Sequence, residues 1–292
     1  GFLGSHLVDR LMKDGEEVIC IDNFFTGRKN NVEHWIGNPY FELIKHDVTE
    51  SIHIDVDRIW HLACPASPIH YQFNPIKTAK TSFLGTYNML GLARRVDARL
   101  LLASSSEVYG DPEEHPQPES YAGCVKTIGI RSCYDEGKRI AETLCSDFNR
   151  MNDTQIRIAR IFNTYGPRML PNDGRVISNF IVQAMNNKPL TIYGDGSQTR
   201  SFCYVDDLIE GLIRLMDSSY SYPVNIGNPD EITISQVAKI ITKKFNNNEN
   251  FDYLEKPIDD PFRRKPLIDL AYQKLNGNQK LILMMELKKH VF

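Results

Sequence analysis

The stretch from Gly1 to Asp22, GFLGSHLVDRLMKDGEEVICID, carries the pattern that decides the fold. Apolar residues at positions 7, 8, 11 and 12 recur at helical spacing, and this pattern ends near Gly15. A short apolar strand follows and is closed by the carboxylate of Asp22. A helix that leads directly into a buried strand is the repeating step of βαβ architecture.

The same alternation continues through the first half of the chain. We expect further buried strands at 41–44, 58–62, 99–104 and 156–162, with helices at 75–96 and 132–151. Strands that alternate with helices of about 10–20 residues indicate an α/β fold with a doubly wound parallel sheet. Beyond Gly166 the segments become short and rich in Gly and Pro. We therefore predict a main domain over 1–165 and a smaller lobe over 166–292, with elements near 201–226 returning to the main domain.

The two ends of the opening stretch suit a dinucleotide. Gly1 and Gly4 are spaced like the last two glycines of a Gly-x-x-Gly-x-x-Gly loop, which lets backbone approach a pyrophosphate and lets helix pack on strand. Asp22 ends the next strand, where its carboxylate can accept both ribose hydroxyls of an adenosine and would repel a 2′-phosphate. The main domain is therefore predicted to be a Rossmann domain that binds NAD in preference to NADP, although Arg28 could soften the preference.

The phosphate loop lacks its first glycine within this sequence. In a doubly wound sheet the strand before such a loop is central, and its loss would leave a slot between unpaired strand edges. We expect residues before Gly1 to form a short apolar strand that ends in Thr-Gly-Gly-Ala or a similar turn, and cofactor binding to be weaker without it.

Tyr134 and Lys138 are four residues apart in the predicted helix, so they share one of its faces. An ammonium beside a phenol favours the phenolate and lowers the pKa of the tyrosine. Such a tyrosine can take a proton from an alcohol while hydride leaves the same carbon, and Ser105 or Ser106 at the nearby strand end can hold the alcohol oxygen. This spacing is common on amphipathic helices, so its meaning depends on the dinucleotide features around it.

Composition excludes several other classes of function. The chain is 41% hydrophobic and 24% charged with a net charge of −3, so it has no basic excess for nucleic acid or an anionic membrane surface. No apolar run approaches the ~18 residues of a membrane span. The six cysteines show no Cys-x-x-Cys pair and no zinc-like spacing to histidine, which predicts no metal site and free thiols in a reducing compartment such as the cytoplasm.

Several sequence blocks occur together in an order that is typical of a known family. The blocks are 22–28, 61–68, 105–112, 134–138, 159–168 and 259–266. With them the chain resembles the extended short-chain dehydrogenases/reductases, and within that family the UDP-glucuronate decarboxylases, from Gly1 to about Leu275. The tyrosine–lysine and glycine motifs are shared by the whole superfamily, whereas several of the longer blocks are specific to this branch.

The resemblance implies a role for each matched position. Those matching cofactor-binding positions are Gly1, Phe2, Leu3, Gly4, Asp22, Asn23, Phe24, Thr26, Gly27, Asp47, Val48, Leu62, Cys64, Thr81 and Ala103, with Tyr134 and Lys138. Those matching UDP-sugar positions are Lys80, Asn88, Arg95, Asn163, Arg175, Gln198, Arg200 and Arg264. Those matching catalytic positions are Tyr134, Lys138, Ser105, Ser106, Glu107 and Arg264.

The implied reaction converts UDP-glucuronate to UDP-xylose and CO2, with NAD regenerated in each cycle. Oxidation at C4 makes a β-keto acid, so the electrons left by departing CO2 enter an enolate. Tyr134 would take the C4 hydroxyl proton, with Ser105 holding the C4 oxygen. Arg264 could engage the carboxylate or support reprotonation at C5, and Glu107 could position water or assist that transfer.

Two other readings stay open on the sequence. Sugar-nucleotide 4,6-dehydratases resemble the chain but carry an aspartate–glutamate pair where it has Ser106-Glu107, and 4-epimerases usually lack the glutamate as well. A related 4-epimerase or dehydratase is therefore one alternative. The other is a catalytically silent nucleotide-binding fragment.

Two further expectations concern assembly and the C-terminus. The resemblance implies a homodimer in which the helices at 75–96 and 132–151 pair across a two-fold axis as a four-helix bundle. After Leu275 the family has a Gly-Trp-x-Pro-type segment, whereas this chain reads NGNQKLILMM over 276–285.

Overall fold

The computed structural model describes residues 1–255 and 262–275, so the divergent segment at 276–285 and part of the block at 259–266 lie outside the described residues. The helices are α1 (Phe2–Lys13), α2 (Pro68–Phe73), α3 (Pro75–Lys80), α4 (Thr86–Val96), α5 (Ser132–Asn152), α6 (Val176–Met185), α7 (Val205–Asp217), α8 (Ile234–Lys244) and α9 (Asp269–Lys274). Shorter helical turns are η1 (Lys29–Asn31), η2 (Glu33–Trp35), η3 (Thr81–Gly85, a π-helical turn) and η4 (Ser106–Tyr109).

The strands are β1 (Val18–Asp22), β2 (Phe41–Lys45), β3 (Arg58–His61), β4 (Arg99–Ser105), β5 (Ile156–Ile161), β6 (Thr164–Tyr165), β7 (Leu190–Tyr193), β8 (Thr199–Ser201), β9 (Cys203–Tyr204), β10 (Pro223–Ile226), β11 (Glu231–Thr233), β12 (Phe251–Leu254) and β13 (Arg263–Arg264).

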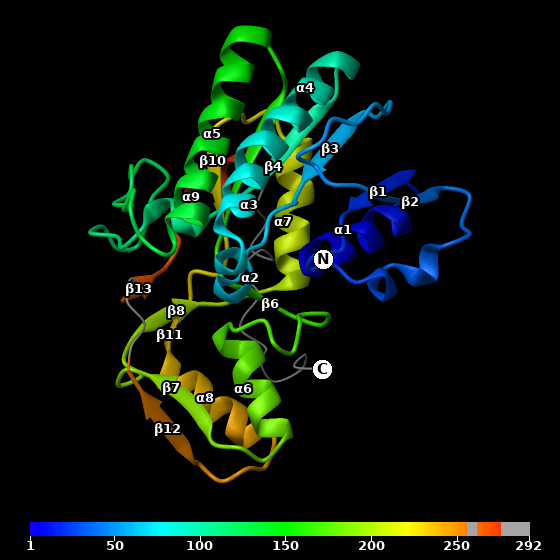
Figure 1. Ribbon diagram of the computed structural model, residues 1–292. Helices are drawn as coiled ribbons and strands as arrows, with labels where there is room; N and C mark the ends of the chain where they lie inside the picture. Colours follow the sequence, from blue (N-terminus) through cyan, green and yellow to red (C-terminus); the bar gives the residue numbers. More distant parts are fainter. Residues whose placement is uncertain (256–261, 276–292) are drawn as a thin grey trace.

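The centre of the main domain is a parallel four-stranded sheet in the order β3-β4-β5-β10. Helices cover both of its faces (Figure 1), and successive residues of β4 show why. Leu100 and Leu102 pack with α4 and α5, whereas Leu101 packs with α1 and α7 on the opposite face. A strand buried on both faces reads as a continuous apolar run, as β4 does. The predicted doubly wound α/β sheet is confirmed.

The predicted helix at 75–96 is divided into α3, the π-helical turn and α4. Gly85 lies in that turn, and a Cβ at this position would come within 2.8 Å of Val48 Cγ2. The turn also faces α5, where Gly137 lies between Tyr134 and Lys138 and approaches Ser82 closely. These contacts set how deeply α5 sits against the rest of the domain.

A smaller lobe forms around α6, α8, β7 and β12 and lies below the main domain in Figure 1. Two later elements belong to the main core instead: α7 packs against α1, and β10 pairs with β5. Short β6 and β9 pair in parallel where the chain passes between the two cores. The sheet β11-β8-β13 brings Arg264 to the side of the lobe that faces the main domain.

β1 and β2 form a separate parallel pair beside the four-stranded sheet. Within 1–255 and 262–275, no strand pairs with the second edge of β1 or of β3. A cavity of about 940 Å³ reaches into this gap, where Val18, Cys20, Ile59 and Trp60 line it. The apolar lining continues into the polar cleft described below.

Gly137 and Gly91 offer a matched test of the packing of α5. Gly137→Ala should destabilise the protein, because the new methyl would lie 2.9 Å from Ser82 Cβ and Oγ. Gly91→Ala on α4 has open space around it and should stabilise the helix by about 0.5–1 kcal/mol. Urea unfolding of both variants measures the difference, and a stabilised Gly137→Ala would contradict this account of the α5 contact.

Candidate active site

The serine, tyrosine and lysine that the sequence predicts to be catalytic come together at the carboxyl end of β4. Ser105 is the last residue of β4, and its side chain accepts a hydrogen bond from the Glu107 amide at 3.2 Å. Ser105 also hydrogen-bonds the buried phenol of Tyr134 on α5. The neighbouring Ser106 lines the same cavity. Of the two serines left open by the sequence, Ser105 is the one that touches Tyr134.

Lys138 does not lower the pKa of Tyr134 in the way that the sequence suggested. Burial raises the pKa of Tyr134, the nearby Cys64 acts in the same direction, and the hydrogen bond with Ser105 opposes them only in part. Lys138 Nζ lies 5.7 Å from the centre of the Tyr134 ring and donates to the Ala103 carbonyl at 2.7 Å. The ammonium is thus directed at the backbone of β4, and desolvation outweighs its effect.

Tyr71 is part of this site although sequence reasoning did not select it. Its ring stacks on that of Tyr134, with 5.0 Å between centroids and 11° between planes. Among the described residues its buried hydroxyl has no hydrogen-bond partner. Tyr71 belongs to α2, so the contact depends on how α2 packs against α5. The only sequence signal was its closeness to the block at 61–68.

Glu107 lies between two guanidinium groups. Arg131 Nη2 donates to Glu107 Oε2 at 2.5 Å, and Arg264 Nη1 donates to Glu107 Oε1. Burial by itself would raise the pKa of Glu107, but Arg264 and Arg131 outweigh it and hold the pKa below its ordinary value. Glu107 therefore stays ionised and can position groups, but it does not store a proton. Arg131 was missed; its signal was an arginine three residues before Tyr134.

Asp135 is a neighbour of Arg131, and its pKa is shifted in the opposite direction to that of Glu107. Its carboxylate is 3.8 Å from Arg131 Nε, and its other oxygen is buried with no hydrogen-bond partner among the residues that the structure describes. Burial, followed by the charge of Glu107, raises the pKa of Asp135. The positive side chains of Arg131, Arg264 and Lys138 thus outnumber the ionised carboxylate of Glu107 in the cavity, which favours an anionic ligand.

The nucleotide end of the cleft lies at the start of α1 and the ends of β1 and β2. Asp22 Oδ1 accepts from the Phe24 amide at 2.7 Å, and Oδ2 pairs with the Gly1 amine at 3.0 Å. Gly27 packs so closely that a Cβ there would lie 2.3 Å from Asp22 Oδ2. Gly1 precedes α1 and has no side chain to cap it, so the backbone amides of the first turn of α1 can face a phosphate. This cradle of carboxylate, close backbone and helix start fits NAD.

Asp47 and Val48 follow β2 beside this cradle. Asn23 Nδ2 donates to Asp47 at 3.0 Å, and Lys77 Nζ pairs with Asp47 at 2.8 Å. Partial burial opposes ionisation, but Lys77 and Thr49 lower the pKa of Asp47 well below its usual range. The other cofactor candidates that line the cavity are Phe2, Leu3, Gly4, Phe24, Thr26, Leu62, Cys64, Thr81 and Ala103.

Five of the eight UDP-sugar candidates line the cavity. They are Asn163, Arg175, Gln198, Arg200 and Arg264. Arg175 pairs with Asp173, while buried Arg200 donates to the Thr199 carbonyl at 2.8 Å. Within the described part of the chain, Gln198 Oε1 and Arg264 Nε are buried without a hydrogen-bond partner.

The other three, Lys80, Asn88 and Arg95, are not among the residues that line the cavity, and their assignment to the UDP-sugar stays a prediction. Lys80 is exposed at the end of α3. The Asn88 amide donates to the Val48 carbonyl at 3.0 Å, and exposed Arg95 bonds His53 and the Ile54 carbonyl. Asn88 and Arg95 thus contact the segment that follows β2.

Two searches of the described residues gave negative results. No cluster of three or more His, Cys, Asp or Glu side chains in 1–255 and 262–275 could hold a metal ion. In the same ranges, no helix has the length and apolar character needed to cross a membrane.

Comparisons with known proteins agree with this geometry. Residues 1–227 match the model of the NAD dependent epimerase/dehydratase family. The chain is 59% identical to UDP-glucuronic acid decarboxylase 2 of Arabidopsis thaliana, over 97% of this chain and 64% of the relative. It is 58% identical to UDP-glucuronic acid decarboxylase 3 of the same organism, over 97% of this chain and 83% of the relative. The chain thus spans somewhat less than two thirds of the length of the first of these relatives.

A solved structure shows the same fold. UDP-N-acetylglucosamine 4-epimerase from Methanobrevibacter ruminantium M1, in complex with UDP-N-acetylmuramic acid, superimposes with a TM-score of 0.90 at 26% identity. The match covers 100% of this chain and 93% of the epimerase. The Rossmann-type fold, the matched family model and the close relatives together establish that this chain belongs to the NAD-dependent epimerase/dehydratase family.

Proposed function

We propose that the protein is a UDP-glucuronate decarboxylase that forms UDP-xylose and CO2 by oxidation at C4, loss of CO2 and re-reduction. The observation that carries this proposal is the buried guanidinium of Arg264, which faces the same cavity as Tyr134. A fixed cation beside the oxidising tyrosine suits a substrate that carries a carboxylate next to the carbon being oxidised. The decarboxylase relatives give independent support.

The residues divide the chemistry between them. Tyr134 takes the C4 hydroxyl proton, and Ser105 holds the C4 oxygen and later the enolate oxygen. NAD, held by Asp22 and the start of α1, would supply the hydride chemistry at C4. Arg264 orients the carboxylate, while Glu107 holds Arg264 and Arg131 in place. We assign cofactor binding mainly to 1–165 and UDP-sugar binding mainly to 166–292.

The six cysteines bear on the cellular compartment. All six, at positions 20, 64, 124, 133, 145 and 203, are free thiols. Free thiols, several of them partly exposed, favour a reducing compartment, so we propose a cytoplasmic location.

Product analysis tests the reaction. The protein incubated with UDP-glucuronate and without added NADH should yield UDP-xylose and CO2 by mass analysis of the nucleotide sugar. Formation of UDP-galacturonate would identify a 4-epimerase instead. Unchanged substrate in the presence of bound NAD would identify a silent nucleotide-binding protein.

Two substitutions should stop the reaction at different steps. Tyr134→Phe removes the proton acceptor without changing the ring stack, so oxidation should fall by about 10²–10⁴-fold while UDP-sugar binding stays close to normal. Arg264→His should allow the C4 ketone to form and slow the loss of CO2. NADH absorbance and product analysis after a single turnover separate the steps. If both variants stop at oxidation, the division of roles is wrong.

We propose that the gap between β1 and β3 receives one further parallel strand that leads into Gly1. The apolar side chains on both sides of the gap support this, because such edges are stable when paired and covered. An apolar strand ending in Thr-Gly-Gly-Ala, added before Gly1, should tighten NAD binding by about 1–3 kcal/mol, the scale of one or two charge-assisted hydrogen bonds.

A flexible Gly/Ser extension of equal length is the matched control for this titration, because it also removes the ion pair of the Gly1 amine with Asp22. Equal NAD affinities for the two extended chains would show that the strand contributes nothing to the cofactor site.

We also propose a homodimer that pairs α3, α4 and α5 across a two-fold axis. Exposed apolar side chains on these helices and on the turn η3 between α3 and α4 support it: Ile76, Phe83, Leu84, Tyr87 and Ile140. Sedimentation at micromolar concentration should show a dimer, and Ile76→Glu or Ile140→Glu should shift it to monomer. Tyr222, which is about as exposed as Ile76, lies outside these helices, so Tyr222→Glu should leave the dimer intact. A wild-type monomer would rule the proposal out.

A further inference from the structure

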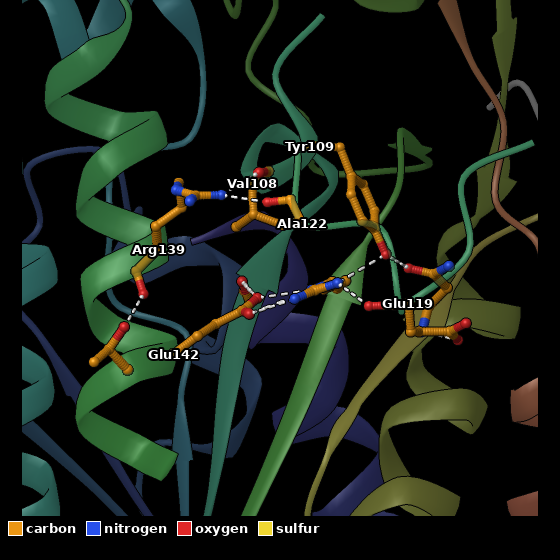
Figure 2. Close-up of polar contacts among 10 residues, drawn as sticks. Val108, Tyr109, Glu119, Ala122, Arg139 and Glu142 are labelled. Atoms are coloured by element: carbon orange, nitrogen blue, oxygen red, sulfur yellow. Dashed lines mark hydrogen bonds and ion pairs between the residues drawn. The ribbon is translucent and has the colours of Figure 1, made fainter. Parts of the chain in front are cut away.

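A buried polar network lies behind the cavity and joins the catalytic elements to one another (Figure 2). Its centre is Arg160 on β5, which pairs with Glu142 of α5 at 2.8 Å and donates to the Tyr109 hydroxyl at 3.0 Å. Glu142 is one helical turn beyond Lys138, and Tyr109 is two residues beyond Glu107. The network therefore ties the helix of the oxidising pair to the turn that carries Glu107.

The next link runs from Tyr109 to Asn225 on β10. Tyr109 donates its hydroxyl to Asn225 Oδ1 at 2.7 Å. Asn225 Nδ2 donates in turn to the carbonyls of Gln117 and Leu267, at 2.9 and 3.0 Å. Asn225 and Gln117 are fully buried, so water cannot reach their polar groups. These hydrogen bonds satisfy the groups instead.

Gln117 holds the residues that directly follow Arg264. Its side-chain Oε1 accepts from the Lys265 backbone amide at 2.8 Å, and its backbone amide donates to the Lys265 carbonyl at 2.9 Å. Its carbonyl also accepts from the Leu267 amide at 2.9 Å. The strand that carries Arg264 has two residues and pairs only with β8 among the described strands. The position of the Arg264 backbone thus depends largely on Gln117.

We propose that Gln117 and Asn225 are positioning residues that hold Arg264 where it can engage the carboxylate of the sugar. This inference rests on the proposed function and deepens it. Arg264 Nη2 donates to the Gly110 carbonyl at 3.0 Å and Nη1 pairs with Glu107, while Nε is buried with no partner among the described residues. The Nε–H group of Arg264 is therefore a buried donor that a ligand can use. Whether a ligand reaches it depends on where the 265–267 segment places the guanidinium.

Ligand selectivity tests this role without requiring turnover. UDP-glucuronate and UDP-xylose differ by the carboxylate alone. Calorimetric titration gives both affinities when every NAD-loaded protein compared, the reference protein included, carries Tyr134→Phe to prevent turnover. Gln117→Ala removes the side-chain acceptor of the Lys265 amide but keeps the backbone bonds, and a shift of about 1 Å at a reacting centre costs up to ~10²-fold. We expect Gln117→Ala and Asn225→Ala to weaken UDP-glucuronate binding about tenfold and to leave UDP-xylose binding unchanged.

Two control variants sharpen the comparison. Gln117→Glu keeps an Oε1 acceptor and should restore most of the selectivity. Asn228→Ala deletes another buried amide, which donates to the Phe202 carbonyl at 3.1 Å and does not touch 265–267, so it should keep the wild-type preference. If Asn225→Ala does not fold, Gln117→Ala carries the test.

The outcomes separate this inference from the proposed function. Folded variants that keep the wild-type preference overturn the inference, and so does an equal loss of affinity for both ligands, which marks a merely structural role. A wild-type protein with no preference for UDP-glucuronate overturns the proposed function, and the inference with it, because there is then no carboxylate site to position.

Discussion

The ion pair between Arg160 and Glu142 is the constraint on which the arrangement of the candidate site depends. Both side chains are only 12% exposed, and the guanidinium makes three hydrogen bonds to the carboxylate while also bonding Tyr109. Breaking such a buried pair from one side costs about 3–5 kcal/mol, because it leaves an uncompensated charge in the interior. The geometry is therefore held tightly, and β5, α5 and η4 keep a fixed relation to one another. Ser104, just before the catalytic serine, donates to the same carboxylate at 2.5 Å.

The charge distribution in the cavity follows from this rigid frame. Arg131, Arg264 and Lys138 bring three positive groups to the walls of one cleft, and Glu107 stays ionised between two of them. Burial raises the pKa of Tyr134, so deprotonation of this phenol carries a desolvation cost. The hydrogen bond with Ser105 offsets part of that cost. The same positive walls suit a sugar nucleotide, whose phosphates and carboxylate are all anionic.

The two parts of the nucleotide cleft are joined through helices rather than through a continuous sheet. α1 leads into β1 on one side and packs against α7 on the other, so it couples the β1-β2 pair to the four-stranded core. α2 has a similar role near the nicotinamide end, because its Tyr71 stacks on Tyr134 while Ile69 packs against Gly174 in the smaller lobe. Packed helices therefore connect the β1-β2 pair, the four-stranded core and the smaller lobe.

The sequence by itself determined the main strands and helices of the first 165 residues, the doubly wound arrangement, Asp22 at a strand end and Tyr134 with Lys138 on one helix face. These depend on local periodicity and spacing, which a linear pattern records. Only the tertiary structure decided that Arg131 and Arg264 share Glu107, across separations of 24 and 157 residues, and that Tyr71 stacks on Tyr134. It also reversed the expected pKa shift of Tyr134. Contacts between distant segments and the loss of water on burial arise only when the chain is packed, so no local pattern predicts them.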